Sequence, residues 1–220
     1  MPKIIDLTLT VKDGMRGVKF EPCHTVAKEG WNTRTLHLYS HSGTHMDAQL
    51  HFAAGAGTID RIPLTDCLGP AWVVDLLHLE PKVLITVAHL GPIAAKVQPH
   101  DSLLLKTGWS KHVDNPQYYR DCFPRISQEL ADWCVAKRIN MLGVEPPSVA
   151  DVNNLAEVTA IHKTLLAGNI VIVEGLTNLD ALAHERVFFC AAPLKIDGGD
   201  GSPCRAFAIE GGFLDRLTAG

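Results

Sequence analysis

One short stretch of the chain, residues 41–51, restricts how the backbone can fold. It carries three of the chain's 11 histidines and one carboxylate, in the order His41, His45, Asp47 and His51. Imidazole and carboxylate groups at this density are typical of a site that binds a cation or transfers protons. In one straight strand, His41 and His51 would lie about 33 Å apart, at roughly 3.3 Å per residue. Because the ligands of one cation must converge, we expect the chain to turn sharply inside this stretch.

Two positions inside the stretch permit such turns. Gly43 tolerates backbone conformations that other residues avoid, and Ala48–Gln49 offers a second bend before His51. Side chains two residues apart on one strand point to the same face, so His45 and Asp47 can face one cation together. The stretch therefore predicts a bent segment whose polar side chains meet.

Length and composition limit the remaining possibilities. With 220 residues, 46% of them hydrophobic, the chain can bury one sizeable core, and we expect one domain over residues 1–220 with residues 1–32 as an extended N-terminal arm. A net charge of −4 without a Lys/Arg cluster argues against a nucleic-acid partner. We expect no membrane association, because no apolar run reaches the roughly 18 residues of a membrane span and the N-terminus lacks signal-peptide features. The six scattered cysteines, without a C-x-x-C pair, are typical of reduced thiols in a cytoplasmic protein.

Apolar runs alternate with helical patterns along the chain, which predicts an α/β fold with a mixed sheet. Helices are expected after Ser127, a good N-cap residue, and over residues 155–166, where Leu155, Val158, Ile161 and Leu165 share one face. We expect strands over residues 4–10, 33–39, 71–77, 102–105, 140–144, 170–173, 188–191 and 205–210.

Two further polar residues accompany these elements. His162 borders the apolar face of the second helix, so its side chain should point inward. Glu174 follows the β-branched run 170–173, at the carboxyl end of an interior strand, where α/β proteins usually place their sites. A buried carboxylate needs a cation or a hydrogen-bond donor, so Glu174 is a further candidate ligand.

The chain resembles a known protein family. Residues 41–51, His-Ser-Gly-Thr-His-Met-Asp-Ala-Gln-Leu-His, are similar to the H-x-G-T-H-x-D-x-P-x-H signature of the Putative cyclase family, which includes bacterial kynurenine formamidase and isatin hydrolase. The resemblance covers residues from about 36 to 210 and includes the segments 103–109, 143–148, 162–179, 192–196 and 201–205.

The resemblance implies a fold of the swivelling β/β/α type, a small-molecule substrate and a homodimer or homotetramer. It also implies a binuclear zinc site, with manganese as the other metal to consider. The implied roles are metal ligation by His41, His45, Asp47, His162 and Glu174, with Asp47 and Glu174 touching both ions, and proton transfer by His51.

The sequence departs from the family pattern in two places. Gln49 stands where the signature has proline, so the turn before His51 should be less rigid. The N-terminal arm lacks the Trp-Pro-Gly-Asp-like segment of the kynurenine formamidases, where the arm helps to enclose the substrate. Phe20 and Trp31 on this arm, with Trp109 after a family-like turn, are the candidate substrate-contacting aromatics.

The donor set by itself favours hydrolysis. Ions held by histidines and carboxylates lower the pKa of bound water, and a neighbouring histidine such as His51 can take its proton and pass it to a leaving nitrogen or oxygen. We therefore expect a metal-dependent hydrolase. The resemblance implies that it acts on carbon–nitrogen bonds other than peptide bonds, with N-formylkynurenine as the leading substrate, a step of tryptophan catabolism. The closest alternative is a manganese-dependent hydrolase of an isatin-like cyclic imide or a lactone.

Other interpretations stay open from the sequence. The histidines could form a structural metal-binding module, although such sites are usually closed and rich in cysteine. A cysteine nucleophile, Cys23 or Cys204, is a third possibility. The segment 197–201, Asp-Gly-Gly-Asp-Gly, is interpreted as a tight turn.

Overall fold

The computed structural model describes residues 2–211, and its central feature is a mixed β-sheet that closes on itself. Strand β4 pairs with both β10 and β12, so seven strands form a barrel-like ring, while β1 (Lys3–Asp6) lies outside it against β12. The ring contains, in spatial order, β12 (Gly201–Glu210), β11 (Arg186–Pro193), β5 (Leu68–Asp75), β7 (Ser102–Lys106), β9 (Met141–Val144), β10 (Val171–Glu174) and β4 (His45–Asp47). The predicted α/β class with a mixed, barrel-like sheet is confirmed.

The middle of the ring is parallel. Strands β5, β7, β9 and β10 run in one direction, whereas β4, β11 and β12 pair antiparallel with their neighbours. The first four residues of β7, Ser102 to Leu105, are buried, as expected for a parallel strand that is covered on both faces. The carboxyl ends of β9 and β10 therefore lie at the same edge of the sheet, and β10 ends there at Glu174.

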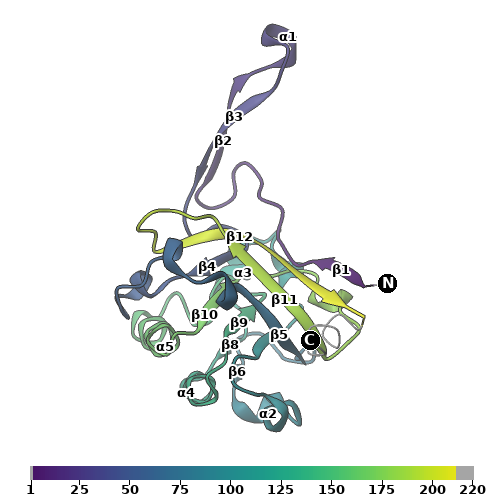
Figure 1. Cartoon of the computed structure of the whole chain (residues 1–220), viewed down its shortest axis with the longest axis vertical. Helices are drawn as coiled ribbons and strands as arrows, with labels where there is room; N and C mark the ends of the chain where they lie inside the picture. Colours follow the sequence, from purple (N-terminus) through teal and green to yellow (C-terminus); the bar gives the residue numbers. More distant parts are fainter. Residues whose placement is uncertain (1, 212–220) are drawn as a thin grey trace.

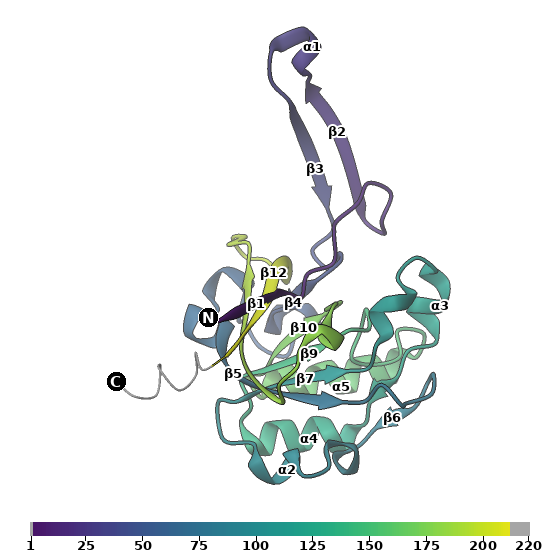
Figure 2. The same cartoon turned by 90° about the vertical axis from the view of Figure 1, so that its right-hand side faces the viewer.

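Helices α2 (Ile93–Lys96), α4 (Gln128–Lys137) and α5 (Leu155–Ala167) cover the outer face of the parallel strands (Figure 2). Both longer helices have the caps that their sequences favour. Ser127 Oγ accepts a hydrogen bond from Leu130 N at 3.1 Å, and Asn154 Oδ1 accepts one from Glu157 N at 3.2 Å. Leu155 was expected on the apolar face but is 78% exposed, because it is the first residue of α5 and extends beyond the sheet.

Two apolar clusters fill the space on either side of the sheet. One lies between the sheet and the helices and includes Leu105, Leu130 and Leu165. The other fills the inside of the ring and includes Met46 and Phe189. Met46 and Phe189 are both completely buried, so the ring encloses a packed core and not a pore.

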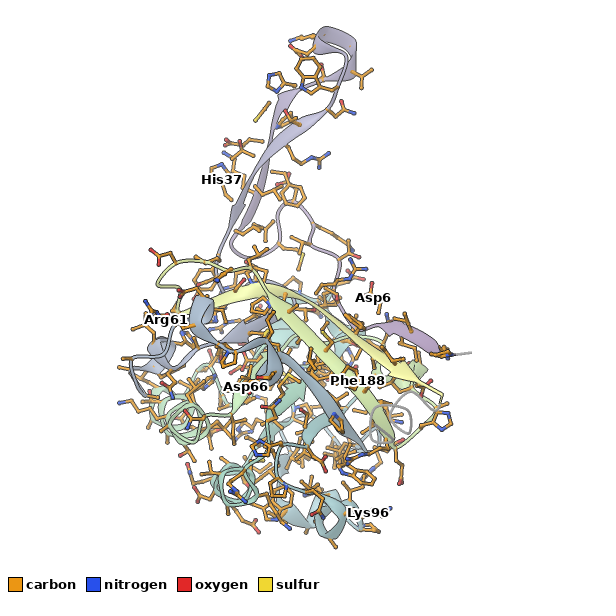
Figure 3. The ribbon with its side chains drawn as sticks, in the orientation of Figure 1. Asp6, His37, Arg61, Asp66, Lys96 and Phe188 are labelled. Atoms are coloured by element: carbon orange, nitrogen blue, oxygen red, sulfur yellow. The ribbon has the colours of Figure 1, made fainter. Side chains whose placement is uncertain are left out.

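The N-terminal region, expected as an extended arm, contains regular structure. Residues 11–32 include β2 (Val18–His24) and the short helix α1 (Val26–Glu29). Strand β2 pairs with β3 (Thr33–Leu38), and this hairpin projects from the body with α1 at its tip (Figure 1). His37 marks its middle in Figure 3. We name residues 18–38 the arm hairpin.

The remaining short elements connect these parts. They are α3 (Pro116–Asp121), β6 (Leu84–Ile85), β8 (Arg125–Ile126) and 3-10 turns at Gln49–Phe52, Ile59–Arg61, Leu64–Cys67, Val87–Leu90, Trp109–His112 and Leu179–Ala181. Among residues 2–211, no helix has the length and apolar character needed to cross a membrane.

Candidate metal centre

The bent segment predicted from residues 41–51 brings its polar side chains together. Gly43 has a φ of 59°, strand β4 follows, and a 3-10 turn over Gln49–Phe52 carries His51 back toward His41. The rings of His41 and His51 stack with their centroids 3.8 Å apart. Both turns expected from the sequence are therefore present.

Pairing between β4 and β10 adds the distant carboxylate. Glu174 lies opposite His45 in the antiparallel register, so the two side chains share a face, as do His45 and Asp47 along β4. His45 Nε2 lies 3.2 Å from Glu174 Oε2. Helix α5 packs against β10 and points the buried His162 at the same place, with Nε2 3.3 Å from Glu174 Oε1.

Asp47 is at the centre of this arrangement. Its Oδ1 lies 2.9 Å from His41 Nδ1 and 3.7 Å from His45 Nε2, while its Oδ2 lies 3.7 Å from His162 Nε2. Two groups of donors share Asp47, and within each group the donor atoms lie within 4.8 Å of one another. One is His41, His45 and Asp47, and the other is Asp47, His162 and Glu174. A third group with the same spacing, His41, His51 and Asp200, lies beside them and is less buried.

Backbone carbonyls fix two of the imidazoles from behind. His45 Nδ1 bonds Gly43 O at 2.9 Å, and His162 Nδ1 bonds Val158 O at 2.7 Å. A histidine that donates its Nδ1–H in this way presents the Nε2 lone pair to the other side, which is the usual arrangement for a metal ligand.

The donor set passes a physical test for a bound cation. Asp47 Oδ2 is buried and has no hydrogen-bond partner among the described residues, which would be costly for a carboxylate oxygen with nothing to bind. Nitrogen and oxygen donors in this number suit zinc or manganese. The residues present therefore fit a metal ion, and the geometry makes this cluster the candidate metal centre.

The charges inside the centre depend on one another. Burial alone would raise the pKa of Glu174, but the hydrogen bonds and charges of His162 and His45 outweigh it and hold the pKa far below its usual value. Burial alone would lower the pKa of both histidines, but their contacts with Glu174 and the charge of Asp47 raise it. Neutral ligand histidines would leave the two buried carboxylates with an excess of negative charge, which a divalent cation would offset.

His51 has a different environment from the other histidines. Its side chain is 24% exposed, and burial, the largest effect, lowers its pKa below 6.5. The Phe52 ring meets His51 edge-on at 4.5 Å and stacks on His162 at 4.4 Å, and the two imidazoles also meet edge-on with their centroids 5.9 Å apart. A mainly neutral, partly accessible imidazole beside the donor cluster is able to accept a proton near neutral pH.

The three candidate substrate aromatics are not brought together. Phe20 and Trp31 lie on the arm hairpin, which projects away from β4 within one copy of the chain (Figure 1). Trp109 is 4% exposed, donates its indole N–H to Tyr119 O at 2.8 Å and stacks on Tyr118. Trp109 thus belongs to a small aromatic core.

One residue at the site was missed by the sequence reasoning. Asp200, in the segment interpreted only as a tight turn, places Oδ2 3.0 Å from His41 Nε2 and 3.7 Å from His51 Nδ1. Burial would raise its pKa, but the hydrogen bond from His41 outweighs this effect and lowers it. The two contacts join residues 159 and 149 positions apart, and no local pattern could have indicated them.

Comparison with known proteins agrees with this geometry. The model of the Putative cyclase family matches residues 5–151. The chain belongs to this family. The chain is 33% identical to kynurenine formamidase from Salinibacter ruber over 177 residues, which is 80% of this chain and 78% of that protein.

Solved structures match the fold of this chain over nearly the whole length of the chain. Isatin hydrolase A from Ralstonia solanacearum superposes with a TM-score of 0.85 at 24% identity, covering 96% of this chain and 92% of that one. A predicted metal-dependent hydrolase from Bacillus stearothermophilus superposes with a TM-score of 0.75 at 27% identity, covering 95% and 98%.

Hydrogen bonds hold the side chain of Gln49, which stands in place of the signature proline. The amide nitrogen of Gln49 donates to Leu166 O at 3.2 Å and to Asn169 Oδ1 at 2.8 Å, and its Oε1 accepts from Gly57 N at 3.1 Å. The first two bonds attach the turn before His51 to the end of α5, and the third attaches it to the loop that follows. The expectation of a less rigid turn stays a prediction, and these side-chain hydrogen bonds are a restraint that acts against it.

Proposed function

We propose that the protein is a metal-dependent hydrolase that opens a carbon–nitrogen bond in a small amide, with N-formylkynurenine as the first substrate to test and formate and kynurenine as the products. The observation that carries this proposal is the carboxylate of Asp47, shared between two groups of donors and buried with an unpartnered oxygen. The likeness to kynurenine formamidases indicates the substrate class.

The proposed ligands divide into two overlapping sets. His41, His45 and Asp47 would hold one ion, and His162 would hold the second, with Asp47 and Glu174 reaching both. We propose zinc for both positions, and manganese as the alternative, because nitrogen and oxygen donors suit either. When bound, the ions would polarise the substrate carbonyl and acidify a water molecule.

The chain's own contribution to the chemistry is proton transfer by His51. Its lowered pKa keeps the imidazole neutral at neutral pH, so it can accept a proton from the attacking water. The same imidazole can then donate that proton to the leaving nitrogen. Phe52, in contact with both His51 and His162, limits how far the His51 ring can rotate during these steps.

The test is hydrolysis of N-formylkynurenine by zinc-loaded and manganese-loaded protein, followed by the absorbance of kynurenine. Turnover would place the protein in tryptophan catabolism. A second candidate, ring opening of an isatin-like cyclic imide or a lactone with manganese, is favoured by the close superposition on isatin hydrolases. Turnover of isatin without turnover of N-formylkynurenine would select it and reject the first substrate.

We further propose that the protein acts as a homodimer in which the arm hairpin of each copy packs on the other. The hairpin exposes Trp31 at 55%, Leu36 at 51% and Val26 at 60%, and a hairpin of two strands is marginally stable on its own in water. In such a dimer, Phe20 and Trp31 would lie at the second copy's site. The cytoplasmic location expected from the scattered cysteines stays a prediction.

Light scattering of the intact protein and of a Leu36→Glu variant tests the dimer. We expect a dimeric mass for the intact protein and a monomeric mass for the variant, because a charge on the hairpin face that the dimer would bury opposes association. A monomeric intact protein would contradict the proposal.

A further inference from the structure

The segment between β11 and β12 approaches the candidate metal centre from the side opposite α5 and presents one carboxylate. Asp200 Oδ2 is 3.0 Å from His41 Nε2 and 3.7 Å from His51 Nδ1. The carboxylate thus contacts both stacked imidazoles. Because its side chain is 43% exposed, it lies at the rim of the centre, outside the buried donor set.

Hydrogen bonds outside the centre hold this segment in place. Asp200 O accepts from Ala48 N at 2.9 Å, immediately after β4, and Gly199 O accepts from Ile59 N at 2.9 Å. On the other side, Gly198 N donates to Asp60 Oδ1 at 3.2 Å. The position of the Asp200 carboxylate is therefore set by the backbone of residues 48–60 as well as by the histidines.

Gly201 permits the close approach. A Cβ atom at this position would lie 2.6 Å from His41 Cε1 and 2.8 Å from Met46 O, closer than such atoms occur. The backbone after Asp200 can pass directly beneath the His41 ring only because residue 201 has no side chain. The sequence therefore provides both the carboxylate and the space that lets it reach the imidazole.

The two nitrogens of His41 face two different carboxylates. Nδ1 lies 2.9 Å from Asp47 Oδ1, inside the donor group, whereas Nε2 faces Asp200. A neutral imidazole carries one N–H, and donating Nε2–H to Asp200 leaves the Nδ1 lone pair for an ion beside Asp47. At His51 the same carboxylate lies 3.7 Å from Nδ1, beyond hydrogen-bond distance, but its charge would favour a proton on that nitrogen and leave Nε2 as the proton acceptor.

We propose that Asp200 is a positioning residue that selects the tautomer and orientation of His41 for metal ligation and of His51 for proton transfer. The inference rests on the proposed function, because it assumes that His41 binds an ion. Carboxylates that orient ligand histidines typically change metal affinity by about 10–100-fold when they are removed.

Cobalt(II) binding tests the inference without any substrate. The full chain and its Asp200→Ala and Asp200→Asn variants are titrated with Co²⁺, following the visible absorption of the ion and its competition with a chelator. Asp197→Asn serves as the matched control, since Asp197 is an exposed carboxylate of the same segment. Thermal unfolding of each variant verifies that it is folded.

We expect Asp200→Ala to bind the same number of Co²⁺ ions about 10–100-fold more weakly, with an altered absorption spectrum. Asp200→Asn keeps a neutral acceptor for His41 Nε2–H and should recover part of the affinity, and Asp197→Asn should match the unaltered protein. A merely structural residue would not show this graded recovery.

Three results would overturn the inference. Unchanged affinity and spectrum in Asp200→Ala would mean that the carboxylate does not position His41, while the proposed function would stand. Loss of one bound ion in Asp200→Ala would make Asp200 a ligand itself. Failure of the unaltered chain to bind Co²⁺ would refute the proposed function and this inference together.

Discussion

At the scale of single residues, Asp47 shows most directly how this chain prepares a place for a cation. One of its oxygens faces two histidines and the other, buried, has no protein partner among the described residues. Folding buries that oxygen without a donor from the described residues, so the fold carries a desolvation cost that a bound ion removes. Asp47 is therefore both a candidate ligand and a source of local instability without metal.

His51 should be needed for turnover but not for metal retention, because it belongs to neither of the two donor groups that share Asp47. We expect His51→Ala to lose about 10²–10⁴-fold in turnover while keeping its bound metal. Steady-state kinetics and metal analysis of the same preparation measure both quantities. His78→Ala, at an exposed position, is the control and should keep full turnover. Loss of metal together with intact turnover in His51→Ala would reject this role.

Glu145 is a buried carboxylate outside the metal centre whose oxygens are satisfied by hydrogen bonds. It follows β9 and accepts from Ser110 Oγ at 2.8 Å, Thr107 Oγ1 at 3.2 Å and Gly108 N. Burial raises its pKa above the usual 4.5 despite these bonds. Its function is to hold the turn after β7 against the end of β9.

The raised pKa of Glu145 predicts a pH-dependent stability. Below pH 4.5 the carboxyl group is protonated in both states; as the pH rises, the unfolded chain ionises first, so the free energy of unfolding falls until the folded group ionises too. The stability of the unaltered protein relative to Glu145→Gln should therefore fall as the pH rises above 4.5. Urea denaturation over a pH series measures it, and a difference that grows with pH would contradict the assignment.

At the scale of elements, strand β4 connects the site to the sheet. It is only three residues long, His45 to Asp47, yet it pairs with β10 on one side and β12 on the other. The first pairing aligns His45 with Glu174, and the second brings Gly201, and with it Asp200, beside Asp47. The strand that closes the ring is thus also the strand that assembles the centre.

Gly175 lets this closure happen and should not tolerate a side chain. It has a φ of 66°, and a Cβ there would collide with the carbonyl oxygen of Gly43 in the turn before His45. We expect Gly175→Ala to lower the free energy of unfolding by more than the roughly 1–3 kcal/mol that backbone strain alone costs, as measured by urea denaturation.

A control separates collision from strain in that experiment. Gly14 also has a positive φ, 82°, but has open space around its Cβ position. Gly14→Ala should therefore show only the cost of its backbone conformation. Equal losses in the two variants would mean that the contact with Gly43 is unimportant.

At the scale of the whole molecule, the two apolar clusters and the metal centre contribute separately to stability. The clusters on the two sides of the sheet contain most of the buried side chains, whereas the donor residues come from β4 and the turn before it, the end of β10 and helix α5. Hence the fold should persist without metal, unlike a structural zinc site, whose removal unfolds the domain.

Chelation should therefore lower the melting temperature without unfolding the protein at room temperature. An ion present at 100 times its Kd stabilises by about 2.7 kcal/mol, which corresponds to a shift of about 5–10 °C for a chain of this size. Circular dichroism melts with and without a chelator measure the shift, and refilling with zinc or manganese should reverse it. Complete unfolding by the chelator, with no substrate turned over, would favour the structural metal-binding module.

The sequence by itself determined which side chains could share one centre. The spacing of His45 and Asp47 set them on one face of a strand, helical periodicity directed His162 inward, and the β-branched run placed Glu174 at a strand end. These are local properties, because the repeat of a strand or helix fixes the direction of each side chain within a few residues. Trp109, in contrast, looked like a pocket residue because its neighbours in the fold were not visible.

Only the tertiary structure decided how the ring closes, where Asp200 lies and that the arm pairs with itself as a hairpin. The pairing of β4 with β12 joins segments more than 150 residues apart, and it brings Asp200 to His41. The arm residues satisfy their backbone hydrogen bonds within the hairpin and leave their apolar side chains exposed, a result that local propensity cannot distinguish from a strand in the sheet. Such contacts depend on which strands pair across long separations, and side-chain periodicity contains no information about that choice.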